Sequence, residues 1–244
     1  MKNAILCEGS TDGILLQYFM RKVYHWEDGN NKVNLFGSKV SWFRTMKKES
    51  KRLDIASCRG CSNIISNLNL ILEFNYNATK GEDYAKIAIV TDRDETDTEE
   101  DFLNKISLIL EQNHVCVKEK LAHNEWSTCE YETSIGKMRR MEILILVIPF
   151  EQTGAMETFL LKSISENDEY DARIIEMGNQ FVENIDPKKK YLTKRRYITK
   201  AKFDVYFSIR TAAEQFVQRQ NILKDIEWEK YINIQEEFQK LAEL

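Results

Sequence analysis

The chain has 244 residues, of which 43% are hydrophobic, and its formal net charge is −4. This length suits one large domain, or a core domain with an appendage. The net charge excludes a uniformly basic surface, and the longest apolar run, residues 143–148, is too short to cross a bilayer. Because no charged and apolar leader precedes the first predicted strand, we expect a cytoplasmic protein without a membrane segment.

The first predicted strand ends at a carboxylate. The apolar residues Ile5, Leu6 and Cys7 lead directly to Glu8, and the apolar residues that follow recur with helical spacing. In an open parallel sheet, a junction between a strand and a helix lies at the edge where α/β folds bind ligands. Glu8 is therefore predicted to be a site residue.

Several elements are predicted before the next acidic strand end. Residues 32–36 alternate like a short strand, and Gly37 and Ser38 are predicted to open a polar helix that carries the basic residues of segment 39–52. Residues 64–74 have the pattern of an apolar helix. A strand, a helix and a parallel strand in succession would form a right-handed crossover.

A second strand, residues 86–91, also ends in carboxylates, which are Asp92 and Asp94. If the two strands are parallel in one sheet, their acidic ends meet at the same edge. Residues 96–100 then carry a capping-box signature for a helix whose apolar face begins at Phe102. The sequence thus predicts one acidic cluster at the carboxyl edge of the sheet.

The two acidic motifs, Glu8-Gly9-x-x-Asp12 and Asp92-x-Asp94, resemble those of the TOPRIM domain. This domain occurs in topoisomerases, bacterial primases and nucleases of the overcoming-lysogenisation-defect (OLD) type. The resemblance implies a Rossmann-like α/β core with a mainly parallel central sheet flanked by helices. We expect residues 1–165 to form this metal-binding core and residues 166–244 to form a helical C-terminal extension packed on it.

The later part of the core is predicted to alternate between strands and polar segments. Residues 115–117 are predicted to form a strand, residues 124–140 an irregular polar excursion, and residues 142–149, the most apolar run, a buried strand. Helical patterns then follow at residues 168–184, 201–220 and 225–244.

Glu157 lies in the first turn of a helix predicted to open at Gly154. In single-domain proteins that resemble the OLD type, a Gly-x-x-Glu segment occupies this place, which implies that Glu157 is a metal ligand. The alternative is that Glu157 only stabilises the positive end of the helix dipole.

Clustered carboxylates raise each other's pKa unless a cation neutralises them. Mg²⁺ takes oxygen ligands and often binds through one or two carboxylates plus substrate phosphate, and Mn²⁺ accepts the same ligands. The predicted metal ligands are Glu8, Asp12, Asp92, Asp94 and Glu157. By resemblance to TOPRIM nucleases, Glu8 is a metal ligand or general base, and Lys202, or alternatively Lys200, lies near the scissile phosphate.

Segment 187–202 carries eight Lys and Arg residues and no acidic residue. Such a cluster attracts a phosphate backbone, although a solvated charged face would have the same pattern. The predicted nucleic-acid-binding residues are Lys188, Lys189, Lys190, Lys194, Arg195, Arg196 and Lys200.

The resemblance implies a Mg²⁺-dependent endonuclease that acts on DNA or RNA. OLD-type nucleases usually carry an ATPase half, but this chain has no phosphate-binding loop of the Gly-x-x-x-x-Gly-Lys-Ser/Thr type. We therefore expect either a small nuclease or a toxin-like or antiphage effector that works with a separate ATPase. Two alternatives remain: a nucleic-acid-binding or interaction module with an inactive acidic site, and a metal-dependent phosphohydrolase of small molecules.

Overall fold

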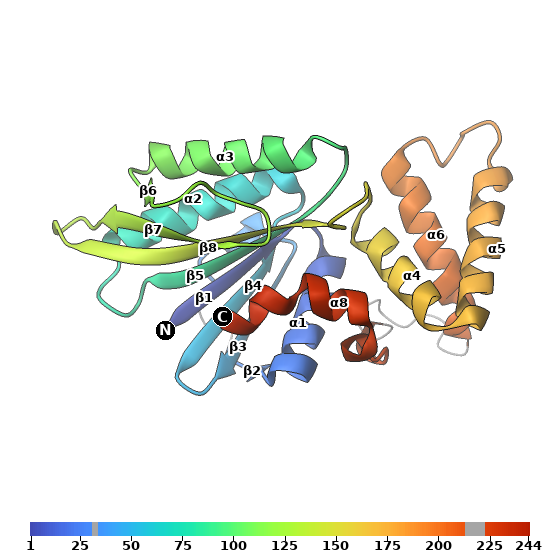
Figure 1. The fold of residues 1–244 in the computed structure, drawn as a ribbon, viewed down its shortest axis with the longest axis horizontal. Coiled ribbons are helices and arrows are strands. Elements are labelled where there is room, and N and C mark those ends of the chain that lie inside the picture. The colour runs from blue at the N-terminus through green and yellow to red at the C-terminus, as the bar shows by residue number, and fades with distance from the viewer. Residues whose placement is uncertain (31–33, 213–222) are drawn as a thin grey trace.

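The computed structural model describes residues 1–30, 34–212 and 223–244. In this part of the chain the strands form one eight-stranded sheet in the order β2-β3-β4-β1-β5-β8-β7-β6, with helices on both faces (Figure 1). The strands are β1 (Lys2–Cys7), β2 (Glu27–Asp28), β3 (Trp42–Lys48), β4 (Lys51–Ser57), β5 (Tyr84–Asp92), β6 (Cys116–Val117), β7 (Trp126–Glu132) and β8 (Met138–Ile148). The helices are α1 (Ser10–Tyr24), α2 (Cys61–Asn77), α3 (Thr98–Gln112), α4 (Met156–Asn167), α5 (Glu169–Ile185), α6 (Arg195–Arg210) and α8 (Ile232–Glu237), with short 3₁₀ turns at η1 (Gly37–Lys39), η3 (Trp228–Lys230) and η4 (Gln239–Glu243).

The α/β class is as predicted, but the sheet is mixed rather than mainly parallel. Strands β4, β1, β5 and β8 run parallel in the centre, whereas the outer strands pair antiparallel. Of the pairings between described strands, three are parallel and four are antiparallel. The parallel centre is the part that the two acidic strand ends occupy.

Two predictions were wrong because they assigned no strand to sequences that form the outer strands β3 and β7 and the adjoining ends of β4 and β8. The basic segment 39–52 is not a polar helix, since β3 and β4 form a hairpin through the turn at Glu49 and Ser50, and only η1 precedes it. The segment 124–140 is not irregular, because it contains β7 and the start of β8. Outer strands are polar on one side, so their patterns are weak signals.

Other boundaries also differ from the prediction. Part of the short strand expected at residues 32–36 and the end of the helix expected at residues 201–220 lie outside the described residues, and Leu35 and Phe36 form a turn. Helix α6 begins at Arg195, earlier than expected. Helix α3 begins without the expected capping box, and the Thr98 hydroxyl instead accepts a hydrogen bond from the Glu95 N–H at 2.7 Å. The stretch after residue 225 holds short helical turns and α8 rather than one long helix.

Two hydrophobic clusters fill the space on the two sides of the sheet. Because side chains alternate along a strand, Ala4 and Leu6 of β1 pack under α2 and α3, whereas Ile5 and Cys7 pack toward α1. The cluster around α1 also includes buried residues of α4, α5, α6 and the C-terminal turns. The C-terminal part of the chain is therefore continuous with the core on this side.

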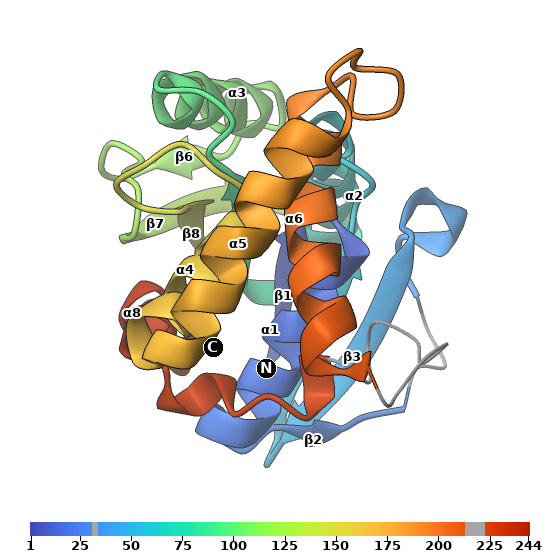
Figure 2. The same ribbon diagram turned by 90° about the vertical axis from the view of Figure 1, so that its right-hand side faces the viewer.

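Helices α4, α5 and α6 pack against one another at one end of the molecule, in front of the end of the sheet (Figures 1 and 2). Near the C-terminus, η3 contacts α1, α8 packs against α4, and the ring of Phe238, which follows α8, lies 5.1 Å from that of Phe19 on α1. The boundary expected after residue 165 falls inside α4. Because α4 packs against α5 and α6, it belongs in space with the helices of the C-terminal extension.

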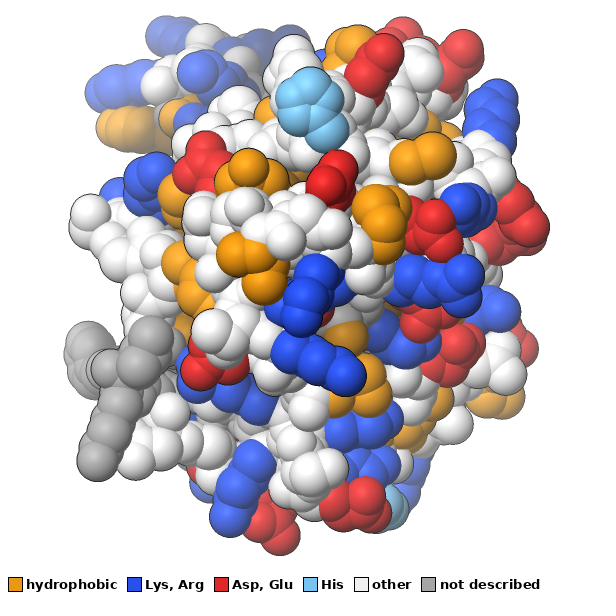
Figure 3. Space-filling view, turned by 90° about the vertical axis from the view of Figure 1, so that its left-hand side faces the viewer, with side chains coloured by type: hydrophobic (Ala, Val, Ile, Leu, Met, Phe, Trp, Pro, Cys, Tyr) orange, Lys and Arg blue, Asp and Glu red, His pale blue; other side chains and the backbone are white. Residues whose placement is uncertain are grey.

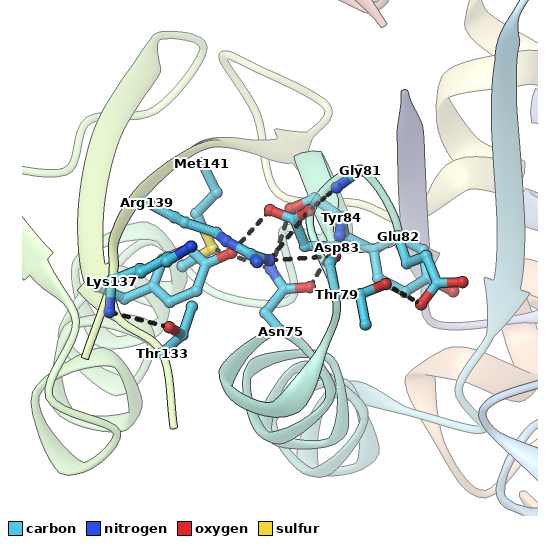
Figure 4. Close-up of polar contacts among 11 residues, drawn as sticks. Asn75, Thr79, Gly81, Glu82, Asp83, Tyr84, Thr133, Lys137, Arg139 and Met141 are labelled. Carbon is cyan, nitrogen blue, oxygen red and sulfur yellow. Dashed lines mark hydrogen bonds and ion pairs between the residues drawn. The ribbon is translucent and has the colours of Figure 1, made fainter. Parts of the chain in front are cut away.

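At the opposite end, the amino ends of the strands are held by polar contacts (Figure 4). The side chain of Asn75, which is fully buried, donates to the Tyr84 carbonyl at 3.0 Å and accepts from the Tyr84 N–H at 2.8 Å. Asp83 accepts a hydrogen bond from the Tyr131 hydroxyl at 3.0 Å and lies 3.4 Å from the Arg139 guanidinium. These contacts fix where β5 starts relative to α2 and the β7–β8 hairpin.

Helix α1 lies unusually close to the sheet at Gly13. A Cβ atom at this position would be 2.4 Å from the Ser57 hydroxyl and 2.8 Å from the Trp42 ring. Such distances are well inside van der Waals contact, so glycine is required there. The close approach fixes the first turn of α1 against the carboxyl end of β4. Among the described residues, no helix is long and apolar enough to span a bilayer.

Candidate metal and phosphate site

The carboxyl ends of the parallel strands bring four acidic residues to one edge of the sheet. Glu8 follows β1 and Asp92 ends β5, and the register places Cys7 beside Val90 in these two adjacent strands. Asp12 and Glu157 lie in the first turns of α1 and α4, and each is only 5% exposed.

Hydrogen bonds orient three of these carboxyl groups. Glu8 Oε1 accepts from the Thr91 hydroxyl and from the Asp92 N–H, the latter at 3.2 Å. Asp92 Oδ1 accepts from the Met156 N–H at 3.0 Å. Asp12 Oδ2 accepts from the Gly9 N–H at 2.7 Å. The β1, β5 and α4 termini are thus connected through the acidic side chains themselves.

The pKa values show that these groups repel one another. The pKa of Asp12 is raised from its ordinary 3.8 to about 7, chiefly by burial and further by the nearby Glu157 and Glu8, while the hydrogen bond from Gly9 lowers it. Burial, followed by Asp12, Glu8 and Glu157, raises the pKa of Asp92 well above its ordinary value. Burial likewise raises the pKa of Glu8, opposed by the Thr91 hydrogen bond. These carboxyl groups are therefore protonated more readily than free ones, unless a cation offsets their charge.

This set of groups fits a hard divalent cation in chemistry, because carboxylate oxygens are the ligands that Mg²⁺ and Mn²⁺ prefer. Among residues 1–30, 34–212 and 223–244, no group of three or more His, Cys, Asp and Glu side chains has the spacing of a complete metal site. Mg²⁺ usually keeps several waters and shares its coordination with substrate phosphates. Glu8, Asp12, Asp92 and Glu157 interact electrostatically at this edge, and the charge of Asp94 also acts on Glu8.

A pocket of about 380 Å³ lies between this acidic edge and the start of α6. One wall contains Asp92, Asp94 and Glu157. The other wall is basic and is formed by Lys194, Arg195, Arg196, Thr199 and Lys200. Carboxylates and cations therefore face the same space, which is the pairing that a metal-assisted reaction of a phosphate ester requires.

Arg195 anchors the start of α6 to the loop after β5. Its guanidinium donates a hydrogen bond to the Asp94 backbone carbonyl and lies 3.5 Å from the Glu95 carboxylate. Asp94 itself is exposed, so its side chain differs in environment from the four buried or partly buried acidic groups at this edge. The contact keeps the basic wall of the pocket close to the acidic one.

The structure separates the two candidate lysines. Lys200 lines the acidic pocket, whereas Lys202 Nζ lies 2.6 Å from Glu183 and lines a different pocket between α4, α5 and α6. Lys202, predicted as the catalytic lysine, is therefore not brought to the carboxylates. The two lysines diverge because residues two positions apart on an α-helix such as α6 point in directions about 200° apart.

The remaining predicted basic residues lie before α6. Lys188, Lys189 and Lys190 are exposed in the loop between α5 and α6, where the Lys190 N–H donates to Asp186 at 2.9 Å. They do not line the acidic pocket. On the opposite end of the molecule, away from α4, α5 and α6, basic and acidic side chains are interspersed on the surface (Figure 3). That face therefore differs from the loop before α6, where basic residues are clustered.

Two residues that support the site were not predicted. Thr91 donates to Glu8, and its position directly before Asp92 at a strand end was the available signal. Arg93 is only 7% exposed, donates from Nε to the Pro149 carbonyl at 2.7 Å and pairs with Glu99 at 2.6 Å. A basic residue between two acidic ones suggests charge compensation, but nothing in the sequence indicates that it joins β5 to the loop after β8.

Comparison with solved structures gives remote likenesses. A hypothetical protein from Pyrococcus horikoshii OT3 is 14% identical, with 91% of this chain and 96% of that one covered and a TM-score of 0.49. A glyoxalase/bleomycin resistance protein/dioxygenase family enzyme from Burkholderia phytofirmans PsJN is 11% identical, with coverage of 59% and 96% and a TM-score of 0.21. At these identities and TM-scores neither structure indicates a function for this chain.

The comparison with curated proteins gave no match. A family model described as "Protein of unknown function (DUF3226)" matches residues 2–240, which is nearly the whole chain. The chain therefore belongs to the DUF3226 family.

Proposed function

We propose that this protein is a metal-dependent nuclease with a TOPRIM-like site, which hydrolyses phosphodiester bonds of DNA or RNA. The observation that carries the proposal is the pocket in which Asp92 and Glu157 face the basic start of α6. Burial raises the pKa of Asp92, and carboxylates that are ionised in such surroundings are costly to the fold unless a cation offsets their charge. Placing them opposite a cluster of Lys and Arg would serve a substrate that is itself anionic.

The acidic residues would hold Mg²⁺ or Mn²⁺ at the sheet edge. Asp92, Asp94 and Glu157, which line the pocket, and Glu8 and Asp12, whose charges act on Asp92, are the residues for this role. When bound, such an ion polarises the phosphodiester and lowers the pKa of a bound water.

The chain's own residues would supply position and proton transfer. Glu8, whose pKa is raised mainly by burial, would hold a proton more strongly than an ordinary carboxylate and would act as the proton acceptor. Lys200, rather than Lys202, would lie beside the phosphate, and Arg195 and Arg196 would hold the flanking backbone. The hydrogen bond from Thr91 keeps Glu8 directed toward the end of β5.

The test is a cleavage assay on plasmid DNA and total RNA in Mg²⁺ or Mn²⁺, with Asp92→Asn as the probe and Glu130→Gln as the matched control. Glu130 is paired with Lys118 and Arg140 on β7, away from the pocket, so its change should leave activity intact. We expect wild type and Glu130→Gln to cleave and Asp92→Asn to lose activity at least about a hundredfold.

Equal activity in wild type and Asp92→Asn would contradict the proposal, as would an absence of cleavage in all three proteins when a cell extract supplies any ATPase partner. Hydrolysis of a small phosphate ester without cleavage of either polymer would instead support the phosphohydrolase alternative. Binding of nucleic acid without any hydrolysis would support the interaction module.

A further inference from the structure

The basic segment 188–197, which runs from the loop after α5 into the first turn of α6, also presents two tyrosine rings to solvent. Tyr191 is 71% exposed and Tyr197 is 37% exposed. A cation lies over each ring, with Lys190 Nζ 5.0 Å from the centre of the Tyr191 ring and Arg196 Cζ 5.1 Å from that of Tyr197. Aromatic faces and cations are therefore paired along this stretch.

These tyrosines do not hold the helix on the protein. Further along α6, Phe203, Tyr206 and Phe207 are at most 3% exposed and pack in the hydrophobic core. The aromatic residues of this region thus divide into buried ones, which attach α6, and exposed ones, each of which has a cation over one face of its ring. An exposed aromatic ring beside a cation suits a partner that has both flat π-faces and negative charge.

Two small pockets lie beside this segment, and basic side chains line both of them. The acidic pocket of about 380 Å³ adjoins a second pocket of about 400 Å³, and the two share Arg195 and Thr199 as lining residues. The second pocket is also lined by Lys162 and Lys202, and none of its lining residues is acidic. Each volume is at the lower end of the range for small-ligand sites, about 300–1,000 Å³, so each suits one flexible unit of a chain rather than a rigid duplex.

Base pairing decides which nucleic acid can use such a surface. In a duplex the base faces are stacked on one another, so an exposed tyrosine ring finds no free face. An unpaired strand offers a face at every base, and stacking on aromatic residues together with cations along the backbone is the usual way of binding it.

We propose that segment 188–197 binds single-stranded nucleic acid, with bases stacked on Tyr191 and Tyr197 and the backbone held by Lys188, Lys190 and Arg196. The strand would then pass the start of α6 and enter the acidic pocket. This inference names the substrate class of the site and rests in that respect on the proposed function. It adds two residues, the tyrosines, to which the cleavage chemistry assigns no role.

The test measures binding by fluorescence anisotropy with labelled oligodeoxythymidine, labelled oligouridine and a fully paired duplex, in the absence of divalent metal. The variant Tyr191→Ala/Tyr197→Ala should bind both single strands at least about tenfold more weakly than wild type, since each stacked base contributes a factor of this order. The variant Tyr191→Phe/Tyr197→Phe keeps the rings and should bind as wild type does. Tyr170→Ala is the matched control, because Tyr170 is 75% exposed on α5, outside the basic segment.

Duplex binding should be weaker than single-strand binding and unchanged by the tyrosine substitutions. Equal affinity for duplex and single strand, or single-strand affinity that survives loss of both rings, would overturn the inference. Comparison of the affinities for oligodeoxythymidine and oligouridine decides whether the natural ligand is DNA or RNA.

A cleavage assay with the same variants separates this inference from the proposed function. If wild type cleaves while the tyrosines prove irrelevant to binding, only the single-strand inference fails. If the tyrosines govern binding but neither wild type nor Asp92→Asn cleaves, the nuclease proposal fails and the single-strand surface stands as a binding site.

Discussion

The carboxylate of Asp92 accepts a hydrogen bond from the backbone N–H of Met156 at 3.0 Å, although the two residues are 64 positions apart. This bond fixes the end of β5 against the first residue of α4, and Glu157 follows directly. A second contact, from the Gly154 N–H to the Arg93 carbonyl at 2.8 Å, holds the same loop. The placement of Glu157 beside the strand-end acids thus depends on a loop that returns from β8 to β5.

The raised pKa of Asp12 gives a pH dependence of stability. Its pKa is about 7 in the folded chain against an ordinary value of 3.8, so the folded state binds this proton more tightly than the unfolded state. The stabilising effect is complete below about pH 4 and is lost as the pH rises toward 7. In Asp12→Asn, where this proton is absent, the free energy of unfolding should fall less between pH 4 and pH 7 than in wild type.

Urea unfolding of the metal-free protein at several pH values measures this difference, and each pKa unit corresponds to about 1.4 kcal/mol. A constant difference between Asp12→Asn and wild type across this range would contradict the pKa shift. Added Mg²⁺ should reduce the pH dependence of the wild type, because a bound cation stabilises the ionised carboxylates.

The two lysines at the start of α6 form a matched pair. Lys200 lines the acidic pocket, whereas Lys202 is held by Glu183. We expect Lys200→Ala to lower the cleavage rate at saturating substrate at least about tenfold, since it removes a positive charge beside the phosphate. Lys202→Ala should change that rate less than about twofold because it breaks only a partly exposed ion pair. The reverse order of effects would assign the phosphate contact to Lys202.

Gly13 is predicted to be intolerant of any side chain. Gly13→Ala should lower the free energy of unfolding by about 1–3 kcal/mol, because the new methyl group would meet Ser57 and Trp42 in a closely packed contact. Gly9→Ala is the control, since its nearest neighbour would be Asp12 Oδ1 at 3.5 Å and a cap substitution of this kind costs about 1 kcal/mol or less. Chemical denaturation of both variants checks the prediction, and equal losses would show that α1 can shift away from β4.

Arg93 should contribute more to stability than an exposed arginine does. Arg93→Met removes hydrogen bonds to Pro149 and Glu99 from a side chain that is nearly buried, so we expect a loss of about 1–3 kcal/mol. Arg140→Met removes only an exposed pair with Glu130, and a change below about 1 kcal/mol is expected. Thermal unfolding would distinguish them, and a comparable effect in both variants would mean that Arg93 does not hold the loop after β8.

Local patterns in the sequence predicted the parts of the fold whose signals are local. The apolar runs that became β1, β5 and β8, and the helical spacing of α1, α2 and α3, are confirmed by the structure. The position of Glu8 and Asp92 at strand ends follows from the same patterns, since each acidic residue directly ends an apolar run. These features depend on residues that are neighbours in the chain.

The tertiary structure decided the features that depend on distant partners. Strands β3 and β7 have weak patterns and become strands by pairing antiparallel with β4 and β8, which border the parallel centre of the sheet. The direction in which α6 presents its lysines follows from where the helix packs, so Lys200 rather than Lys202 reaches the acidic pocket. A local stretch of sequence shows which residue types are present and how they are spaced. Strand partners and helix rotation depend instead on how the whole core is buried, and that involves residues far apart in the chain.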